Sequence, residues 1–391
     1  MATLLPWRSD LQALAVAILI LYSCGPAFAQ GRSGDAIPDQ YIVVLKDSAL
    51  PPGLSRAQAQ ARVADFLQGR GIGADAVGRV YNRALKGFSA RLNAQQRDRL
   101  SSDADVAYVE VDRLMVLSPP HRGGGAPAPT AQQVPWGITR VGGQVDATGK
   151  TAWVIDTGVD LDHPDLNVDA ARSVTFVSKG RDARDANDLN GHGTHCAGTI
   201  AALDNDIGVV GVAAGATIVA VKVLNQQGSG AYSDVIAGVD HVAANATPGD
   251  AVNMSLGGPE SQALDDAVRG VAAAGILMAV AAGNESKDAN TASPARVEAD
   301  NIWTISACDS SDNFASFSNY SGPTQAPVEF CAPGVNILST WKDGGYNDIS
   351  GTSMATPHVA GLLLATGGAI QTDGHVKTGD PDGDPDPIAH R

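Results

Sequence analysis

The chain has 391 residues, which is long enough for two domains, and its composition is typical of a globular protein, with 44% hydrophobic and 18% charged residues. The net charge of −15 is unevenly distributed: residues 1–133 carry 14 Lys and Arg against 11 Asp and Glu, and the remainder carries 13 against 31. An acidic second part argues against nucleic-acid binding. The opposite charges favour association of the two parts with each other.

The N-terminus predicts a cleaved signal segment over residues 1–29. Arg8 precedes an apolar run, residues 11–22, that is short for a membrane span, and residues 27–29 have the small–large–small pattern of a signal cleavage site. A membrane anchor and a lipid anchor at Cys24 are the alternatives. We therefore expect a secreted protein, extracellular or periplasmic, with no membrane attachment after processing.

Residues 30–117 predict a small α+β domain. Strands are expected at residues 41–47 and 106–117, a helix at 56–68, and two strands joined by a turn within 77–92, with a second short helix after them. The order β-α-β-β-α-β is typical of a ferredoxin-like unit.

The segment after this domain, residues 118–133, is rich in Pro, Gly and Ala and predicts an exposed linker. From residue 134 to 391, apolar strand-like runs alternate with helical stretches. This alternation predicts a parallel sheet with helices on both faces, a three-layer α/β/α domain. Functional sites of such sheets lie at the carboxyl ends of the strands, where polar motifs occur in this chain.

Four polar residues follow or precede these apolar elements in positions suited to catalysis. Asp156 ends an apolar strand, from which a carboxylate can orient a histidine, although a turn aspartate is the alternative. His192 is flanked by glycines that we expect to make room for a serine and a substrate. Ser353 lies at the start of a buried helix, whose N-terminus favours an anion, although a plain capping role is commoner. Asn284 suits donation to an oxyanion, or else a turn.

Together, these motifs resemble those of the subtilisin-like serine proteases, nearest to the proteinase K branch. The resemblance covers residues 134–367 and rests on the stretches VIDTGVDLDHPDL, NGHGTHCAGT, AAGN and GTSMATPHVAG. It implies a subtilisin-like fold and a triad of Asp156, His192 and Ser353 that needs no cofactor for catalysis. It also implies an oxyanion hole formed by Asn284 and the Ser353 backbone N–H. A secreted binding or scaffold protein is the rival interpretation, but it requires a missing triad member, and none is missing.

Residues 37–117 resemble the inhibitory propeptide of the same family. The resemblance implies a self-processing zymogen in which the propeptide assists folding, inhibits the enzyme and leaves its last strand in the active-site cleft. We expect self-cleavage between Leu117 and Gln133. The other partners are polypeptide substrates, and a monomer is expected.

Two glycine-containing stretches predict substrate-binding edges, between which an extended peptide adds as a strand. Their candidate residues are Gly228 and Gly230 on the first edge and Ser255, Leu256 and Gly257 on the second. Small residues at 279–283 predict a pocket for an apolar side chain on the N-terminal side of the cleaved bond.

Three cysteines are left once Cys24 has been removed with the signal segment, so at most one disulfide forms within the chain. Cys308 and Cys331 stand at the ends of two expected strands and are the predicted pair. Cys196 is then a free buried thiol beneath the histidine, as in the proteinase K branch.

A zinc site formed by His192, His195 and Cys196 is an alternative interpretation of the histidine motif. It leaves the other three catalytic candidates without a joint explanation, so we disfavour it. His195 and Cys196 are expected to have packing or hydrogen-bonding roles.

The C-terminal residues depart from the family pattern because they lack helical periodicity. Four aspartates alternate with Gly and Pro, at positions 380, 382, 384 and 386. This spacing predicts a solvated acidic tail; Ca²⁺ binding there is the alternative, but the pattern of an EF-hand is absent. The resemblance implies structural Ca²⁺ elsewhere, with ligands that the sequence does not identify.

Overall fold

The computed structural model describes residues 31–118, 121–122, 129, 131–323 and 327–391. The predicted signal segment, including Cys24, and most of the predicted linker lie outside the described residues. In the described part, no helix combines the length and the apolar character needed to cross a bilayer.

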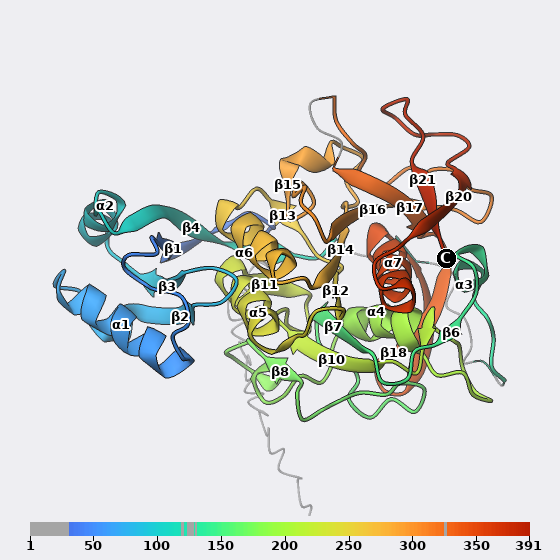
Figure 1. Ribbon diagram of the computed structural model, residues 1–391, viewed down its shortest axis with the longest axis horizontal. Helices are drawn as coiled ribbons and strands as arrows, with labels where there is room; N and C mark the ends of the chain where they lie inside the picture. Colours follow the sequence, from blue (N-terminus) through green and yellow to red (C-terminus); the bar gives the residue numbers. More distant parts are fainter. Residues whose placement is uncertain (1–30, 119–120, 123–128, 130, 324–326) are drawn as a thin grey trace, which may run out of the picture. The chain divides into compact units, whose positions relative to one another are not determined.

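The N-terminal domain has the predicted β-α-β-β-α-β order (Figure 1). Its elements are β1 (Ala36–Leu45), α1 (Arg56–Gln68), β2 (Val77–Tyr81), β3 (Gly87–Arg91), α2 (Ala94–Ser101) and β4 (Val106–Val116), with a 3₁₀ turn at Ala74–Ala76. The strands form an antiparallel sheet in the order β4-β1-β3-β2. Both helices begin with a capping box, Ser55 with Gln58 and Asn93 with Gln96.

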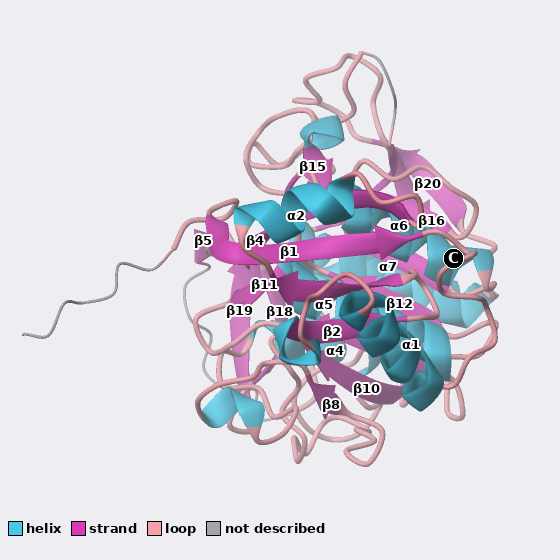
Figure 2. Ribbon diagram, turned by 90° about the vertical axis from the view of Figure 1, so that its left-hand side faces the viewer, coloured by secondary structure: helices cyan, strands magenta, loops and turns pink. Residues whose placement is uncertain are grey.

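This sheet is buried on both faces because its strands alternate two apolar sets. Val43 and Leu45 of β1 pack beneath the domain's own helices, and Ile42 and Val44 pack with the helices of the larger domain. Figure 2 shows α1 and α2 on the outer side of the strands. The sheet therefore connects its own helical layer to the larger domain.

The larger domain is built on a nine-stranded sheet in the order β20-β21-β17-β16-β14-β12-β7-β10-β8. In chain order the strands are β7 (Thr151–Asp156), β8 (Val174–Thr175), β10 (Thr217–Lys222), β12 (Ala251–Met254), β14 (Leu277–Ala281), β16 (Ile302–Cys308), β17 (Val328–Pro333), β20 (Gln371–His375) and β21 (Pro387–His390). All neighbours are parallel except β20 and β21.

Two pairs of helices cover the two faces of this sheet (Figure 1). Val154 of β7 packs in the core with α4 (His192–Ala201) and α7 (Thr352–Thr366), whereas its neighbours Trp153 and Ile155 pack with α5 (Tyr232–Asn245) and α6 (Gln262–Ala273). The predicted three-layer α/β/α architecture is thereby confirmed.

Short elements complete the domain: α3 (Trp136–Arg140), the pair β6 (Val145–Asp146) and β9 (Ala213–Ala214), β11 (Ser229–Ala231), the pair β13 (Gly258–Pro259) and β15 (Ala292–Ser293), the hairpin β18 (Ile337–Trp341) and β19 (Gly345–Ser350) with β5 (His121–Arg122), and 3₁₀ turns at Arg181–Ala183 and Ala289–Thr291.

The C-terminal residues correct part of the prediction of a solvated tail: Asp382 and Asp384 are exposed, but the flanking residues fold onto the sheet. They form a hairpin, and β21 pairs with β17 at Cys331 and Ile388. Ile388 and Asp386 are buried, and Asp386 accepts a hydrogen bond from Ser306. The prediction considered the acidic spacing and overlooked the apolar residues on either side of it, which provide the surface that the hairpin buries.

Candidate active site

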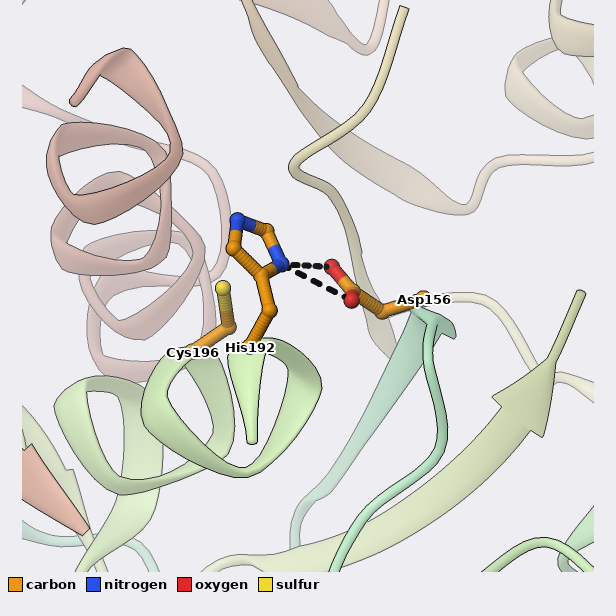
Figure 3. A group of neighbouring side chains, drawn as sticks. All are labelled: Asp156, His192 and Cys196. Atoms are coloured by element: carbon orange, nitrogen blue, oxygen red, sulfur yellow. Dashed lines mark hydrogen bonds and ion pairs between the residues drawn. The ribbon is translucent and has the colours of Figure 1, made fainter. Parts of the chain in front are cut away.

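The predicted aspartate and histidine meet at the carboxyl edge of the sheet. Asp156 is the last residue of β7 and His192 the first of α4, and His192 Nδ1 lies 2.8 and 2.9 Å from the two carboxylate oxygens (Figure 3). Both side chains are buried. Burial alone lowers the pKa of His192, but the Asp156 charge and hydrogen bond outweigh it, so this pKa lies above its ordinary value. The pair can hold one imidazole tautomer and stabilise its cation.

The glycines around His192 have a different role from the predicted one. Gly191 has φ +115°, and a Cβ there would lie 2.3 Å from the Trp341 ring. A Cβ on Gly193 would lie 2.0 Å from the Gly158 carbonyl oxygen. The glycines therefore make room for neighbouring protein groups, which fix the start of α4 against β7, rather than for a serine and substrate.

Ser353 is the second residue of α7 and is held from several sides. Its carbonyl oxygen accepts hydrogen bonds from Ser255 Oγ (2.9 Å) and Cys196 Sγ (3.4 Å). Its own hydroxyl donates to the Ser255 carbonyl oxygen at 3.2 Å. Among the hydrogen bonds of the described residues, this one to Ser255 engages the Ser353 hydroxyl, and none joins it to His192.

Asn284 lines the same cleft as Ser353, and the residue before Ser353 orients its amide. Thr352 donates to Asn284 Oδ1 from its backbone N–H (2.8 Å) and its hydroxyl (3.0 Å). Two donors identify that atom as the oxygen, so the NH₂ group takes the other side of the amide. Asn284 can therefore offer a donor to a developing oxyanion.

The first predicted substrate edge pairs with the propeptide. β11 lies antiparallel to β4, with Ser229 opposite Val116 and Gly230 opposite Met115. The pairing extends one residue further, because the Leu117 N–H donates a hydrogen bond of 2.9 Å to the Gly228 carbonyl oxygen.

The second predicted edge faces the same peptide segment. Ser255, Leu256 and Gly257 line the cleft together with residues 116–118 of the propeptide. Of these, Ser255 also has the supporting role described above, because its hydroxyl binds the Ser353 backbone. At the end of the segment, Ser118 Oγ donates to Glu285 Oε1 at 2.9 Å. The structure thus places all five predicted edge residues beside an extended peptide.

The structure corrects the predicted disulfide. Cys308 and Cys331 are free, buried thiols on the adjacent strands β16 and β17. Cys331 is opposite Ser306 in the register, and Cys308 is opposite Pro333, so the two cysteines are displaced along the strands, although their side chains interact with each other. The predicted free and buried state of Cys196 is confirmed.

The zinc alternative is not supported by the placement of His195. His195 Nε2 contacts the Ile337 carbonyl oxygen at 2.9 Å, and burial lowers the pKa of this imidazole to about 3. Among the described residues, the group of His, Cys, Asp and Glu with ligand atoms close enough for a metal ion is Asp156, His192 and Cys196. In that group the Asp156 carboxylate already binds His192 Nδ1.

Several supporting residues were missed from the sequence. Thr352 fixes Asn284, Thr157 Oγ1 accepts from Gly193 N–H at 2.9 Å, and Asp188 binds the loop before His192. Each stands within four residues of a triad member, so proximity to the motifs was the available signal. Glu285, next to Asn284, had the same signal.

The sheet brings an aspartate to a histidine on α4, and Cys196 of the same helix contacts the backbone of Ser353 at the start of α7. This arrangement is the one expected of a serine peptidase of the subtilisin class. The chain belongs to the subtilase family: the pattern described as Subtilase family matches residues 149–370, and the pattern described as Peptidase inhibitor I9 matches residues 40–118. The resemblance inferred from the motifs is confirmed.

Known relatives and a solved structure agree. Alkaline serine exoprotease A of Vibrio alginolyticus is 41% identical over 338 residues, which make up 84% of this chain and 60% of that protein. The chain therefore spans less than two thirds of that relative. An extracellular serine proteinase of Thermus sp. (strain Rt41A) is 38% identical over 352 residues, 84% of this chain and 80% of that protein. The crystal structure of a cold adapted subtilisin-like serine proteinase matches with a TM-score of 0.55 and 40% identity, over 65% of this chain and 97% of that one.

Proposed function

We propose that this subtilisin-like serine protease is made as a secreted zymogen that processes itself and then acts as an endopeptidase with an apolar preference on the N-terminal side of the cleaved bond. Secretion is supported by the N-terminal signal pattern and by the printed description of the Thermus relative as extracellular. The apolar preference is supported by the Leu256, Ala281 and Ala292 side chains in the cleft.

The proposed reaction uses the triad in two half-reactions. Ser353 Oγ attacks the peptide carbonyl carbon while His192 Nε2 takes the hydroxyl proton; His192 then gives that proton to the leaving amine as the C–N bond breaks. Water repeats the sequence on the acyl-enzyme and releases the acid. Asp156 holds His192 Nδ1–H throughout, and the Asn284 NH₂ and Ser353 N–H stabilise the oxyanion. Subtilase chemistry needs no catalytic cofactor. Structural Ca²⁺ is part of the proposal without assigned ligands.

The single observation that carries the proposal is the propeptide strand: Leu117 is hydrogen-bonded to the Gly228 carbonyl and lines the same cleft as Ser353. It supports inhibition, because it occupies the predicted substrate edge. It supports self-cleavage, because its last residues, 116–118, line the same cleft as Ser353.

Buried polar contacts outside the cleft also support a docked inhibitor. Propeptide carboxylates bind the first turns of two helices: Asp112 accepts from Ser233 N–H of α5, and Glu110 from Ala263 N–H of α6, each at 3.1 Å. In the other direction, Asp240 of α5 accepts from three backbone N–H groups of the propeptide.

The deciding experiment expresses the full chain with Ser353→Ala alone and maps its N-termini by mass spectrometry. We expect no processing between Leu117 and Gln133, and processing restored when active wild-type enzyme is added. A Ser353→Ala protein cleaved there without added enzyme contradicts self-processing. Labelling of wild-type Ser353 by a fluorophosphonate probe, insensitive to a chelator, tests the peptidase assignment separately.

A further inference from the structure

We propose that Asp188 is a positioning residue for the general base: its buried carboxylate sets the place of His192 at the start of α4 and supplies a second negative charge to the imidazole. The inference rests on the proposed role of His192. It concerns a group that lies outside the triad and that the reaction described above does not use.

The first turn of α4 lacks an ordinary cap, which creates the need for such a residue. Its N-cap is Gly191, which has no side chain to accept a hydrogen bond. The N–H groups of His192, Gly193 and Thr194 instead donate to three side chains: Asn190 Oδ1 (3.2 Å), Thr157 Oγ1 (2.9 Å) and Asp188 Oδ2 (3.0 Å), respectively. The position of His192 therefore depends on side chains supplied from outside the helix.

Of the three side chains, Asp188 makes the most hydrogen bonds to the segment around His192. Its Oδ2 also accepts from the Thr194 hydroxyl at 2.7 Å, and its Oδ1 accepts from the N–H groups of Asn190 and Gly191, each at 2.9 Å. The residue is 2% exposed. One carboxylate thus binds the chain on both sides of His192: residues 190 and 191 before it and residue 194 after it.

The hydrogen-bond partners of Asp188 favour an ionised carboxylate. All four of its partners are donors, so a proton on either oxygen would face an N–H or O–H group. Burial raises the pKa of Asp188, and the hydrogen bonds from Gly191, Thr194 and Asn190 oppose that rise. The charge is therefore held by four neutral donors within a loop that carries the catalytic imidazole.

The titratable groups around His192 come from three directions. Asp156 faces it from β7, Asp188 from the loop before α4, and Cys196 and His195 from its own helix. Asp156 and then Asp188 raise the pKa of His192 against burial. Removing the Asp188 charge hence lowers that pKa.

The same loop also reaches the substrate edge. Asn190, whose Oδ1 binds His192 N–H, donates from Nδ2 to the Gln226 carbonyl oxygen at 3.0 Å. Gln226 is two residues before Gly228, whose carbonyl oxygen binds the propeptide. Displacing Asp188 is thus expected to misplace the base relative to the bound peptide.

The test compares processed wild-type enzyme with Asp188→Asn, using kcat and kcat/KM for a chromogenic peptide across pH 5–9. We expect kcat to fall about tenfold or more with KM within about twofold, and the acid limb of kcat/KM to move to lower pH by a few tenths of a pH unit. The matched control is Asp165→Asn. This carboxylate is fully buried, and its side-chain hydrogen bonds go to Val209 N–H, Asn205 and Tyr346, none of which belongs to α4. This variant should lower the melting temperature without moving the acid limb.

An Asp188→Asn enzyme with a wild-type acid limb and kcat overturns the proposal, whatever its melting temperature. If that variant gives no folded enzyme, Asp188→Glu decides: it retains the charge but displaces the loop, so we expect a wild-type acid limb with reduced kcat. Wild-type kcat in Asp188→Glu contradicts positioning. Absence of activity in the wild-type enzyme would instead reject the proposed function.

Discussion

The backbone N–H of Leu117 donates to the carbonyl oxygen of Gly228 over 2.9 Å, which makes the end of the propeptide a strand on the substrate edge of the enzyme. Under the proposed function, a substrate on this edge uses the same hydrogen bonds as the inhibitor. Changes to β11 should therefore affect inhibition and substrate binding together.

Gly230→Ala tests this link. A Cβ at Gly230 would lie 2.3 Å from the Val223 carbonyl oxygen, so β11 has to shift. We expect KM and the inhibition constant of the propeptide to rise together, each by about tenfold, the equivalent of one lost hydrogen bond. The control is Ser229→Ala, which leaves the backbone pairing with Val116 in place. A rise in only one of the two constants would show that they use different contacts.

Asn284→Ala should reduce kcat with little change in KM, because the proposed role of the amide is to stabilise the oxyanion of the transition state. The expected loss is about 10²–10³, a magnitude taken from the oxyanion-hole asparagine of subtilisin itself. Thr352→Val serves as the comparison: it retains the backbone bond to Asn284 but removes the hydroxyl donor, so a smaller loss in kcat is expected. Equal losses in the two variants would mean that the Asn284 amide has no effect on kcat unless the Thr352 hydroxyl orients it.

Asp240→Ala should weaken inhibition without affecting catalysis. Its carboxylate accepts N–H groups from residues 82–84 of the propeptide at 2.7–3.1 Å, and it is remote in the chain from the triad. One hydrogen bond to a charged group contributes about 1.5–3 kcal/mol, so a net loss equivalent to a single one of the three bonds raises the inhibition constant by about 10- to 100-fold, and we expect a rise of at least that size. Progress curves with added propeptide measure it. An unchanged constant, or a fall in kcat of the free enzyme, would contradict this role.

The C-terminal edge of the sheet should make stability depend on pH. Burial raises the pKa of Glu329 to about 8 and that of Asp386 to about 7, well above their values in an unfolded chain. The folded state therefore binds more protons between about pH 4 and pH 8, and stability falls as the pH rises through this window.

Thermal melting of the Ser353→Ala protein, which avoids autolysis, provides the measurement. Asp386→Asn and Glu329→Gln should each flatten the decline in melting temperature between pH 5 and pH 8. The control is Asp384→Asn, which is exposed and should leave the slope unchanged. A stability that rises with pH over this window would show that the two acids are ionised in the folded state.

Local patterns predicted much of the fold and the pairing of Asp156 with His192. The 56–68 helix has the predicted bounds, because its apolar spacing and Ser55 cap are local signals. Asp156 and His192 were predicted as partners because both end or begin elements at the carboxyl edge of a parallel sheet. The remaining features depend on contacts distant in sequence: Trp341 beside Gly191, the strand register that displaces Cys308 from Cys331, and the pairing of β21 with β17. No local periodicity encodes these.

The addition of β11 to the propeptide sheet has a consequence for the free enzyme. When the propeptide leaves, β11 becomes an unpaired sheet edge, the kind of surface through which proteins aggregate. Here it is only three residues long, Ser229–Ala231, and contains a glycine. Its shortness allows it to accept one extended peptide at a time while offering little template for association between enzyme molecules.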